Sequence, residues 1–242
     1  MEDLTRLIIS QERIENIKNN NLELTNEEAH YLNKVMRIKN GKGIFIANGE
    51  GLLWKALKVK NDCLEINQLK KPHLFQEKEI NLLGIAVVIP KSGFDDVLKM
   101  CTEIGIDFIQ PLFSERQVNK NLNFSRKLLR WNTIIKEAVE QSERLWKPSI
   151  LDCMDIIEWI KSRDNKERVS ISITREDTSY DLNQWLKKQK EFLNKKGGIF
   201  WNVIGPEGGW SSREIEFFNK NNNTFVKLSD TILRTSTASI NA

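Results

Sequence analysis

The strongest candidate for a ligand site is the run of residues 205–209, which reads Gly-Pro-Glu-Gly-Gly. An apolar stretch, residues 200–204, precedes it, and Ser211 and Glu214 follow it with the spacing of a helix-capping box. A strand, a glycine turn and the amino end of a helix leave backbone groups that a ligand can approach closely. A second such passage, residues 226–235, comes soon afterwards. The two loops could form one site, although a glycine-rich turn without a ligand explains the first loop equally well.

The residues around the glycine run exclude the familiar nucleotide motifs. No Lys-Ser or Lys-Thr pair follows the run, so it is not a P-loop, and it lacks the Gly-x-Gly-x-x-Gly order of a dinucleotide fold. His30 and His73 have no partner pattern for metal binding or nucleophilic catalysis. The cysteines, Cys63, Cys101 and Cys153, are scattered, which is typical of buried thiols in a reducing cytoplasm. We therefore expect a neutral or cationic ligand held by main-chain groups, and no metal.

Size and charge set broad limits on the protein. Its 242 residues are enough for one large domain or two modest ones. The net charge of +4 favours an anionic partner only weakly, because a mildly basic, solvated surface is common. Neither a signal-like amino end nor a run as long as a membrane span is present in the sequence, which favours a soluble, cytoplasmic protein.

The first seventy or so residues read as a small β-rich module. Residues 44–47 and 52–56 are expected strands, joined by a glycine-containing hairpin at 48–51. A brief helix is expected between Thr25 and Arg37, with Thr25 and Glu28 spaced as a capping box. The polar segment 70–73 is the expected linker.

After the linker, apolar strands alternate with amphipathic helices. The expected strands are residues 82–90, 108–113, 169–174, 199–204 and 225–228, and the expected helices are residues 94–104, 126–145, 155–161, 182–193 and one starting at Ser212. Such alternation predicts an α/β domain with a mainly parallel sheet, whose ligands bind beyond the carboxyl ends of the strands. Three loops are expected at that edge: residues 175–177, 205–210 and 229–235.

Several segments together identify a resemblance to a known family. They are HYLNKVMR (30–37), TEIG (102–105) leading to PLFSER (111–116), EAVEQSER (137–144), IGPEGGW (204–210) and LSDTILRTSTA (228–238). In this order the chain resembles the RsmE branch of the SPOUT superfamily, the 16S ribosomal RNA uridine-N3 methyltransferases. The ordered set covers nearly the whole chain, so the resemblance is specific.

The resemblance implies an α/β protein of two domains. Residues 1–72 would form a small PUA-like β-barrel that binds RNA, and residues 73–242 a SPOUT-type methyltransferase domain tied in a trefoil knot. The implied cofactor is S-adenosyl-L-methionine, and the implied partners are 16S rRNA in the small ribosomal subunit and a second copy of the chain. The implied cofactor-binding residues come from three loops: Thr174, Glu176, Ile204, Gly205, Pro206, Gly208, Gly209, Leu228, Ser229, Ile232, Leu233, Thr235 and Ala238.

Methylation at uracil N3 requires loss of a proton that lies between two carbonyl groups. The enzyme must align donor and nitrogen, remove the proton and stabilise negative charge on the uracil oxygens. Arg234 suits the last role because it is a permanent cation, and for the same reason it is not the base. Glu207 is a candidate base, and ordering of the turn is the alternative role for it.

Four basic residues are candidates for RNA contact. Arg116 and Arg144 lie in family segments, where a surface ion pair is the commoner role for an arginine. Lys34 and Arg37, together with Lys39, form either an RNA-binding face or a solvated helix edge. The tryptophans beside the glycine run, residues 201 and 210, are expected to pack in the core and not to stack on a base.

The last family segment departs from the usual pattern at three places. The family usually reads Leu-Gly-x-Arg-Ile-Leu-Arg-Thr-Glu-Thr-Ala, and here Ser229, Thr231 and Ser236 replace the glycine, the first arginine and the glutamate, while Arg234 is kept. The family also continues through a longer final helix, so the helix after Arg234 is expected to be incomplete at Ala242.

Two other functions are open at this stage. One is a non-catalytic RNA-binding assembly factor on the same scaffold, which the altered 228–238 segment makes conceivable. The other is a small-molecule enzyme on an ordinary doubly wound fold.

Overall fold

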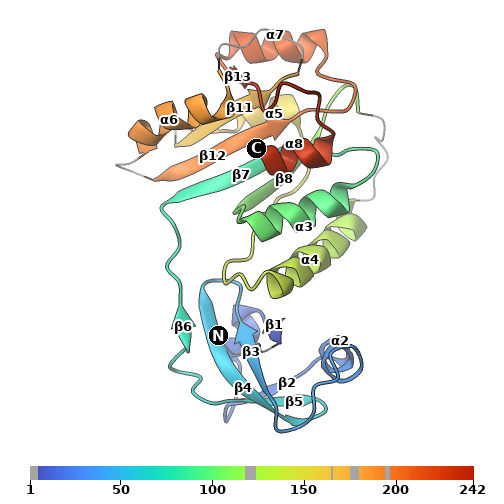
Figure 1. Ribbon diagram of the computed structural model, residues 1–242, viewed down its shortest axis with the longest axis vertical. Helices are drawn as coiled ribbons and strands as arrows, with labels where there is room; N and C mark the ends of the chain where they lie inside the picture. The colour runs from blue at the N-terminus through green and yellow to red at the C-terminus, as the bar shows by residue number, and fades with distance from the viewer. Residues whose placement is uncertain (1–4, 118–123, 165, 175–179, 194–196) are drawn as a thin grey trace. The chain divides into compact units, whose positions relative to one another are not determined.

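The computed structural model describes residues 5–117, 124–164, 166–174, 180–193 and 197–242. The chain forms two compact units. The first combines Met1–Lys78 with Lys136–Lys147, and the second combines Glu79–Ile135 with Pro148–Ala242. Figure 1 shows the elements of each unit along the chain.

A six-stranded sheet makes up most of the first unit. Its strands are β1 (Arg6–Ile8), β2 (Asn21–Glu23), β3 (Gly43–Ala47), β4 (Leu52–Lys60), β5 (Cys63–Ile66) and β6 (Leu74–Phe75). They lie in the order β1-β3-β4-β5-β2, with β6 also paired to β4. The β1/β3 pair is parallel, and the other pairs are antiparallel. The predicted hairpin is confirmed, since β3 pairs with β4 across residues 48–51.

Short helices of the first unit follow local signals. They are α1 (Gln11–Glu15), α2 (Asn26–His30) and a π-helical turn, η1 (Tyr31–Val35). The predicted capping box is confirmed: the Thr25 hydroxyl accepts from the Glu28 amide at 3.2 Å, and the Glu28 carboxylate accepts from the Thr25 amide at 2.9 Å. Apolar side chains such as Leu22, Leu32 and Ile44 fill the core between these helices and the sheet.

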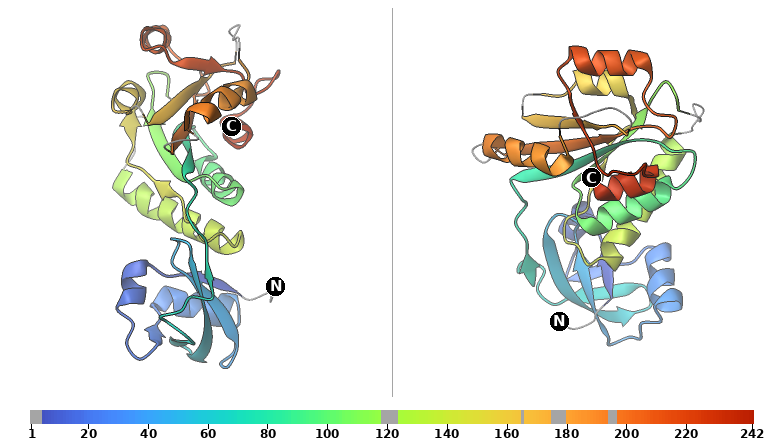
Figure 2. Two further views of the ribbon diagram at one scale, coloured as in Figure 1. Left: turned by 90° about the vertical axis from the view of Figure 1, so that its left-hand side faces the viewer. Right: turned by 45° about the horizontal axis from the view of Figure 1, so that its top comes forward.

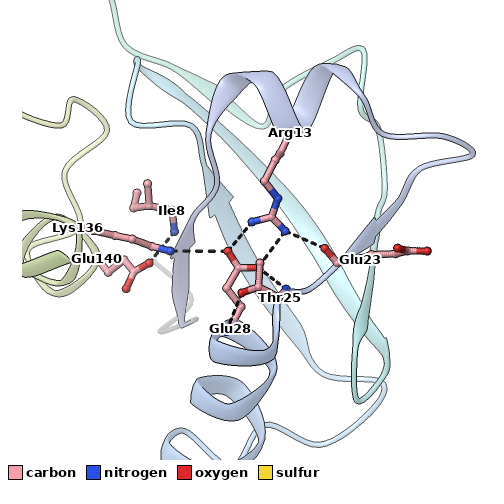
Figure 3. Close-up of polar contacts among 7 residues, drawn as sticks. All are labelled: Ile8, Arg13, Glu23, Thr25, Glu28, Lys136 and Glu140. Atoms are coloured by element: carbon pink, nitrogen blue, oxygen red, sulfur yellow. Dashed lines mark hydrogen bonds and ion pairs between the residues drawn. The ribbon is translucent and has the colours of Figure 1, made fainter. Parts of the chain in front are cut away.

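Residues 136–147 pack within this first unit through charged groups. Arg13 donates to the Glu28 carboxylate at 2.6 Å, and Lys136 approaches the same carboxylate at 3.8 Å (Figure 3). Burial opposes ionisation of Glu28, but the Arg13 and Thr25 hydrogen bonds outweigh it and lower the pKa of this carboxyl. The Glu140 carboxylate accepts from the Ile8 amide at 2.8 Å, and burial raises the pKa of Glu140.

The second unit is built on a seven-stranded sheet. Its strands are β7 (Asn81–Val88), β8 (Phe108–Phe113), β9 (Ser149–Ile150), β10 (Met154–Asp155), β11 (Glu167–Ser172), β12 (Gly198–Ile204) and β13 (Thr224–Val226). Their order is β10-β8-β7-β12-β11-β13, with β9 beside β8. Every pair is parallel, which confirms the predicted parallel sheet.

Helices cover both faces of this sheet. They are α3 (Phe94–Ile104), α5 (Ile156–Lys161), α6 (Leu182–Leu193), α7 (Ser212–Lys220) and α8 (Thr235–Asn241). The remaining helix, α4 (Phe124–Gln141), belongs to this unit up to Ile135 and to the first unit from Lys136 on. Trp159 of α5 and Phe218 of α7 share one buried cluster with Trp201 of β12, and Trp185 of α6 packs on Phe200 in another. Figure 2 shows α5 and α7 on one side of the sheet and α3, α6 and α8 on the other. Helix α3 ends at Gly105 as predicted, with a φ of 108°.

Helix α4 ends earlier than its sequence predicts. Residues 126–145 were an expected helix, but α4 ends at Gln141 and Glu143 has a φ of 59°. The Leu145 carbonyl accepts from the Gly51 amide at 2.9 Å, and the Lys147 amide donates to the Gly49 carbonyl at 2.8 Å. The backbone after residue 141 therefore pairs with the β3–β4 turn and does not continue the helical ladder. No helix among the described residues is long and apolar enough to cross a membrane.

Candidate functional site

The site is built at the carboxyl edge of the parallel sheet, where β11, β12 and β13 end side by side. Strand β11 lies between the other two, and the Ile173 amide donates to the Val226 carbonyl at 3.1 Å. Thr174 follows β11 and is exposed, while Ile204 is the buried last residue of β12. Glu176, the remaining candidate of the first loop, and the rest of the predicted loop 175–177 lie outside the described residues.

The glycine turn that leaves β12 is fixed by its own backbone and by Trp210. The Gly209 amide donates to the Pro206 carbonyl at 2.8 Å, and Gly209 has a φ of 70°, a conformation that favours glycine. A Cβ on Gly205 would lie 2.8 Å from the Trp210 indole. The indole N–H donates to the Ser172 carbonyl of β11 at 3.0 Å. Trp210 is therefore a core residue, as predicted, and it joins the turn to the neighbouring strand.

Glu214 is the residue that ties the turn to the rest of the sheet edge. The residue is 1% exposed, and its carboxylate accepts from the Ser211 amide at 2.7 Å, which completes the predicted capping box. It also accepts from the Ser114 hydroxyl at 2.7 Å and from the Glu115 amide at 3.0 Å. Sequence reasoning found the cap and missed the two distant partners. Ser114 belongs to the PLFSER segment, but no local signal links that segment to Glu214.

Arg116 reaches the glycine turn from the segment that Glu214 holds. Its guanidinium donates to the Gly208 carbonyl at 3.3 Å, and a Cβ on Gly208 would lie 3.7 Å from the Arg116 Cβ. Nearby, Arg213 and Glu115 form an exposed ion pair at 2.6 Å. Arg116, a candidate for RNA contact, thus has a second role available, which is support of the turn that is expected to hold the cofactor.

The second predicted loop follows β13, where the Lys227 amide donates to the Tyr180 carbonyl at 3.1 Å, and beyond this point its side chains form short-range contacts. Lys227 pairs with Asp230 at 2.7 Å, and the Ser229 and Thr231 hydroxyls lie 3.1 Å apart. The two positions that depart from the family pattern here are therefore hydrogen-bonded to each other. Leu228 packs on the Trp185 and Phe200 cluster, whereas Ile232 is 66% exposed and Leu233 is half-buried.

Helix α8 carries this second loop back across the sheet edge. It packs against α3, β7 and β12, so residues 227–234 run from the end of β13 past the strand that bears the glycine turn (Figure 1). Thr235 and Ala238 are buried on α8. The Asn241 side chain donates to the Leu228 carbonyl at 2.6 Å, and the Cys101 thiol of α3 lies 3.9 Å from the Ser239 carbonyl. Burial raises the pKa of Cys101 to about 12.

The two candidate catalytic side chains are exposed at this edge. Arg234 is the residue before α8 and makes no side-chain cap, and Glu207 is the central residue of the glycine turn. Within the described part of the chain neither side chain forms an ion pair or hydrogen bond. Both groups are therefore available to a bound molecule.

The other candidates for RNA contact lie in the first unit. Lys34 is in η1, Arg37 follows it with a φ of 54°, and both are exposed. Arg144 is half-buried and follows α4. The described residues contain no group of three or more His, Cys, Asp and Glu side chains that could hold a metal ion.

Comparison with known proteins defines the class to which this architecture belongs. Residues 76–242 match the model of an RNA methyltransferase domain, and residues 24–56 match that of an RNA methyltransferase PUA domain. Two solved structures share the fold at 22% identity, each covering 98% of this chain and 94% of the other. One is a ribosomal RNA small subunit methyltransferase E from Neisseria gonorrhoeae (TM-score 0.78), and the other is a methyltransferase from Legionella pneumophila (TM-score 0.80). The fold is thus an α/β methyltransferase with a PUA-like domain.

Relatives closer in sequence narrow the class to one family. A ribosomal RNA small subunit methyltransferase E from Synechocystis is 31% identical over 96% of this chain and 74% of its own length. Another, from Buchnera aphidicola subsp. Schizaphis graminum, is 30% identical over 91% of this chain and 87% of its own length. The chain belongs to the RNA methyltransferase family that includes the ribosomal RNA small subunit methyltransferase E proteins.

Proposed function

We propose that this protein transfers a methyl group from S-adenosylmethionine to N3 of one uridine in 16S ribosomal RNA. The observation that carries the proposal is the exposed glycine turn at the end of β12, past which the segment leading to α8 returns. Its family membership supports RNA as the substrate, and the Neisseria relative was solved bound to S-adenosyl methionine.

The residues at the sheet edge fit this cofactor. Residues 207–209 are exposed, and a Cβ on Gly209 would meet nothing within 4 Å, so the backbone is open to a flat ring. We assign adenine recognition to the backbone of residues 204–209 and 228–233, with Thr235 and Ala238 supporting the second loop. When bound, the cofactor supplies a methyl group that its sulfonium has already activated.

Arg234 and Glu207 are the proposed catalytic residues. Arg234 would stabilise negative charge on the uracil oxygens, because its guanidinium is a permanent cation with several donors. Glu207 would accept the N3 proton. Their lack of partners within the described residues supports these roles, since a side chain already held in an ion pair would have to leave that pair first.

The domain roles complete the proposal. Residues 1–72 would bind RNA, and residues 73–242 would carry methyl transfer in a trefoil-knotted domain. The return of residues 227–234 across the sheet edge supports a knotted path. A second copy of the chain would complete the site. The reaction would take place in the cytoplasm, on assembled small subunits.

Mapping of methyl groups on 16S RNA by mass spectrometry tests this function. A deletion strain should lack one N3-methyluridine, the wild-type gene should restore it, and a gene with Arg234→Ala should not. If the RNA of the deletion strain is unchanged, the proposal is wrong. Calorimetry with S-adenosylmethionine distinguishes the non-catalytic assembly factor, which would bind RNA but not the cofactor.

A further inference from the structure

The first unit has a groove that is strongly basic and contains no acidic group. It has a volume of about 480 Å³, and its lining includes Lys34, Arg37, Lys39 and Lys58 together with three asparagines. No carboxylate lines it. The exposed cations, Lys34, Arg37 and Lys39, form no ion pair within the described residues. A groove of one sign of charge concentrates oppositely charged ligands.

Lys58 is a buried, charged residue that lines this groove. It lies on β4 and is only 2% exposed, which is unusual for a lysine. Its ammonium donates to the Ile38 carbonyl at 2.6 Å and to the Asn33 side-chain oxygen. Both acceptors are neutral, and no carboxylate among the described residues pairs with Lys58. An ammonium has three donors, so these two bonds leave one donor for a ligand, and no anionic side chain within the described part of the chain neutralises the charge.

The backbone along the groove has an uncommon conformation, which hydrogen bonds from Lys58 stabilise. The π-helical turn η1 leads into Arg37, whose φ of 54° is rare for a residue with a side chain. The bond from Lys58 to the Ile38 carbonyl fixes the next peptide. Asn33 is held from both sides, because its amide group also donates to the Asn61 carbonyl at 2.8 Å. Strained backbone of this kind persists where surrounding groups determine it, and it is concentrated at functional sites.

We propose that this groove binds a phosphate group of the RNA backbone, with Lys58 as the positioning residue that holds the segment carrying Arg37 and Lys39. This inference rests on the proposed RNA substrate and adds the chemical group that is bound and the residue that shapes the site. Cations and amide donors suit a phosphate. No aromatic side chain lines the groove, so it offers no stacking surface for a base.

The test measures RNA affinity against salt concentration. A variant with Lys34, Arg37 and Lys39 all replaced by Ala is compared with wild type and with Lys18→Ala, an exposed lysine of the same unit outside the groove. Each lost phosphate contact should reduce the slope of log K against log salt by about 0.7 for single-stranded RNA. Because the groove is proposed to bind one phosphate, we expect the triple variant to lose about 0.7 in slope and Lys18→Ala to lose nothing. An unchanged slope in the triple variant would overturn the proposal.

A double-mutant cycle tests the positioning role of Lys58. If Lys58 acts by orienting Arg37, the losses in affinity from Lys58→Met and Arg37→Ala should be clearly less than additive, whereas independent charges would add. The KM for RNA should rise with little change in kcat, and Lys58→Arg should restore part of the affinity. Additive losses would contradict the positioning role. If Lys58→Met does not fold, the cycle is repeated with Asn33→Ala, which removes one acceptor of the same ammonium.

A failure of the groove proposal can be distinguished from a failure of the proposed function. Failure of the groove would leave wild-type methylation and cofactor binding intact. Failure of the proposed function would appear as a wild-type protein that does not methylate 16S RNA, whatever the salt dependence.

Discussion

The two loops at the sheet edge differ in what holds them. Contacts with distant parts of the chain fix the glycine turn, residues 205–211: the Trp210 indole donates to the Ser172 carbonyl, and Arg116 donates to the Gly208 carbonyl. In the second loop, residues 227–234, the side chains after Leu228 form short-range bonds within the loop, such as Lys227 to Asp230. Its bonds from outside are at its first two residues: the Asn241 side chain donates to the Leu228 carbonyl, the Lys227 amide donates to the Tyr180 carbonyl, and the Leu182 amide donates to the Lys227 carbonyl.

This difference separates stability from function within one site. A turn fixed by tertiary contacts is already in its binding conformation, so changes to its supports should lower the stability of the whole domain. A loop that makes few such contacts can be altered without unfolding the protein, and changes there should appear in catalysis. In sequence, the second loop departs from the family pattern at three positions and the glycine turn is the more secure of the two loops. The long-range hydrogen bonds of the glycine turn give a physical reason for this difference.

Glu214→Ala should have the largest effect on the glycine turn. It removes the acceptor of the Ser114 hydroxyl and of the Glu115 and Ser211 amides, and each buried group left unpaired costs about 1–3 kcal/mol. We expect a loss of about 3 kcal/mol in the free energy of unfolding, measured by urea denaturation. Glu216→Ala, on the exposed face of the same helix, is the control and should change nothing measurable. Equal effects of the two variants would contradict a special role for Glu214.

Arg234→Ala should show the opposite behaviour. Because the Arg234 side chain has no partner among the described residues, stability should stay within about 0.5 kcal/mol of wild type. The methylation rate should fall about 100-fold, equivalent to about 2.7 kcal/mol of transition-state stabilisation. Single-turnover assays on small subunits, paired with thermal unfolding, measure both quantities. A variant that loses stability and keeps its rate would reverse the proposed contrast between the loops.

Gly205→Ala should destabilise the glycine turn by a smaller amount. The new Cβ would lie 2.8 Å from the Trp210 indole, so the ring must move, and overpacking of this kind costs about 2 kcal/mol. Gly209→Ala is the matched variant: its Cβ would meet nothing within 4 Å, and only the φ of 70° opposes it, at about 1 kcal/mol. Tryptophan fluorescence should shift for Gly205→Ala only. If Gly209→Ala is the more damaging variant, the packing account of the turn is incorrect.

The sequence predicts best those features that local bonds determine. Both capping boxes, the stop of α3 at Gly105 and the β3–β4 hairpin were all correct, because their partners lie within a few residues. Strand alternation gave the parallel sheet for the same reason, since apolar periodicity is a local property.

Features that depend on distant partners were beyond such reasoning. Nothing near Glu214 predicts that it also binds Ser114, and nothing near Lys58 predicts that it is buried and donates to the Ile38 carbonyl. Helix α4 ends at Gln141 because the backbone that follows it pairs with the β3–β4 turn. The apolar periodicity of residues 126–145 contains no information about this pairing. Family segments located the candidate catalytic residues, but only the structure shows that neither side chain forms a hydrogen bond or ion pair within the described part of the chain.

The smallest expected effect belongs to Asp230→Asn in the second loop. The hydrogen bond from Lys227, aided by its charge, lowers the pKa of Asp230 below its ordinary value of 3.8. A carboxyl with a lowered pKa stabilises the folded state above its unfolded pKa, and this contribution is lost as the pH falls through the folded pKa. Asp230 is 97% exposed, however, so water and salt screen the pair. Wild type and variant should therefore give superimposable stability curves between about pH 7 and pH 3, on either side of the ordinary Asp pKa. A clear acid-dependent difference would show that this loop is held as firmly as the glycine turn.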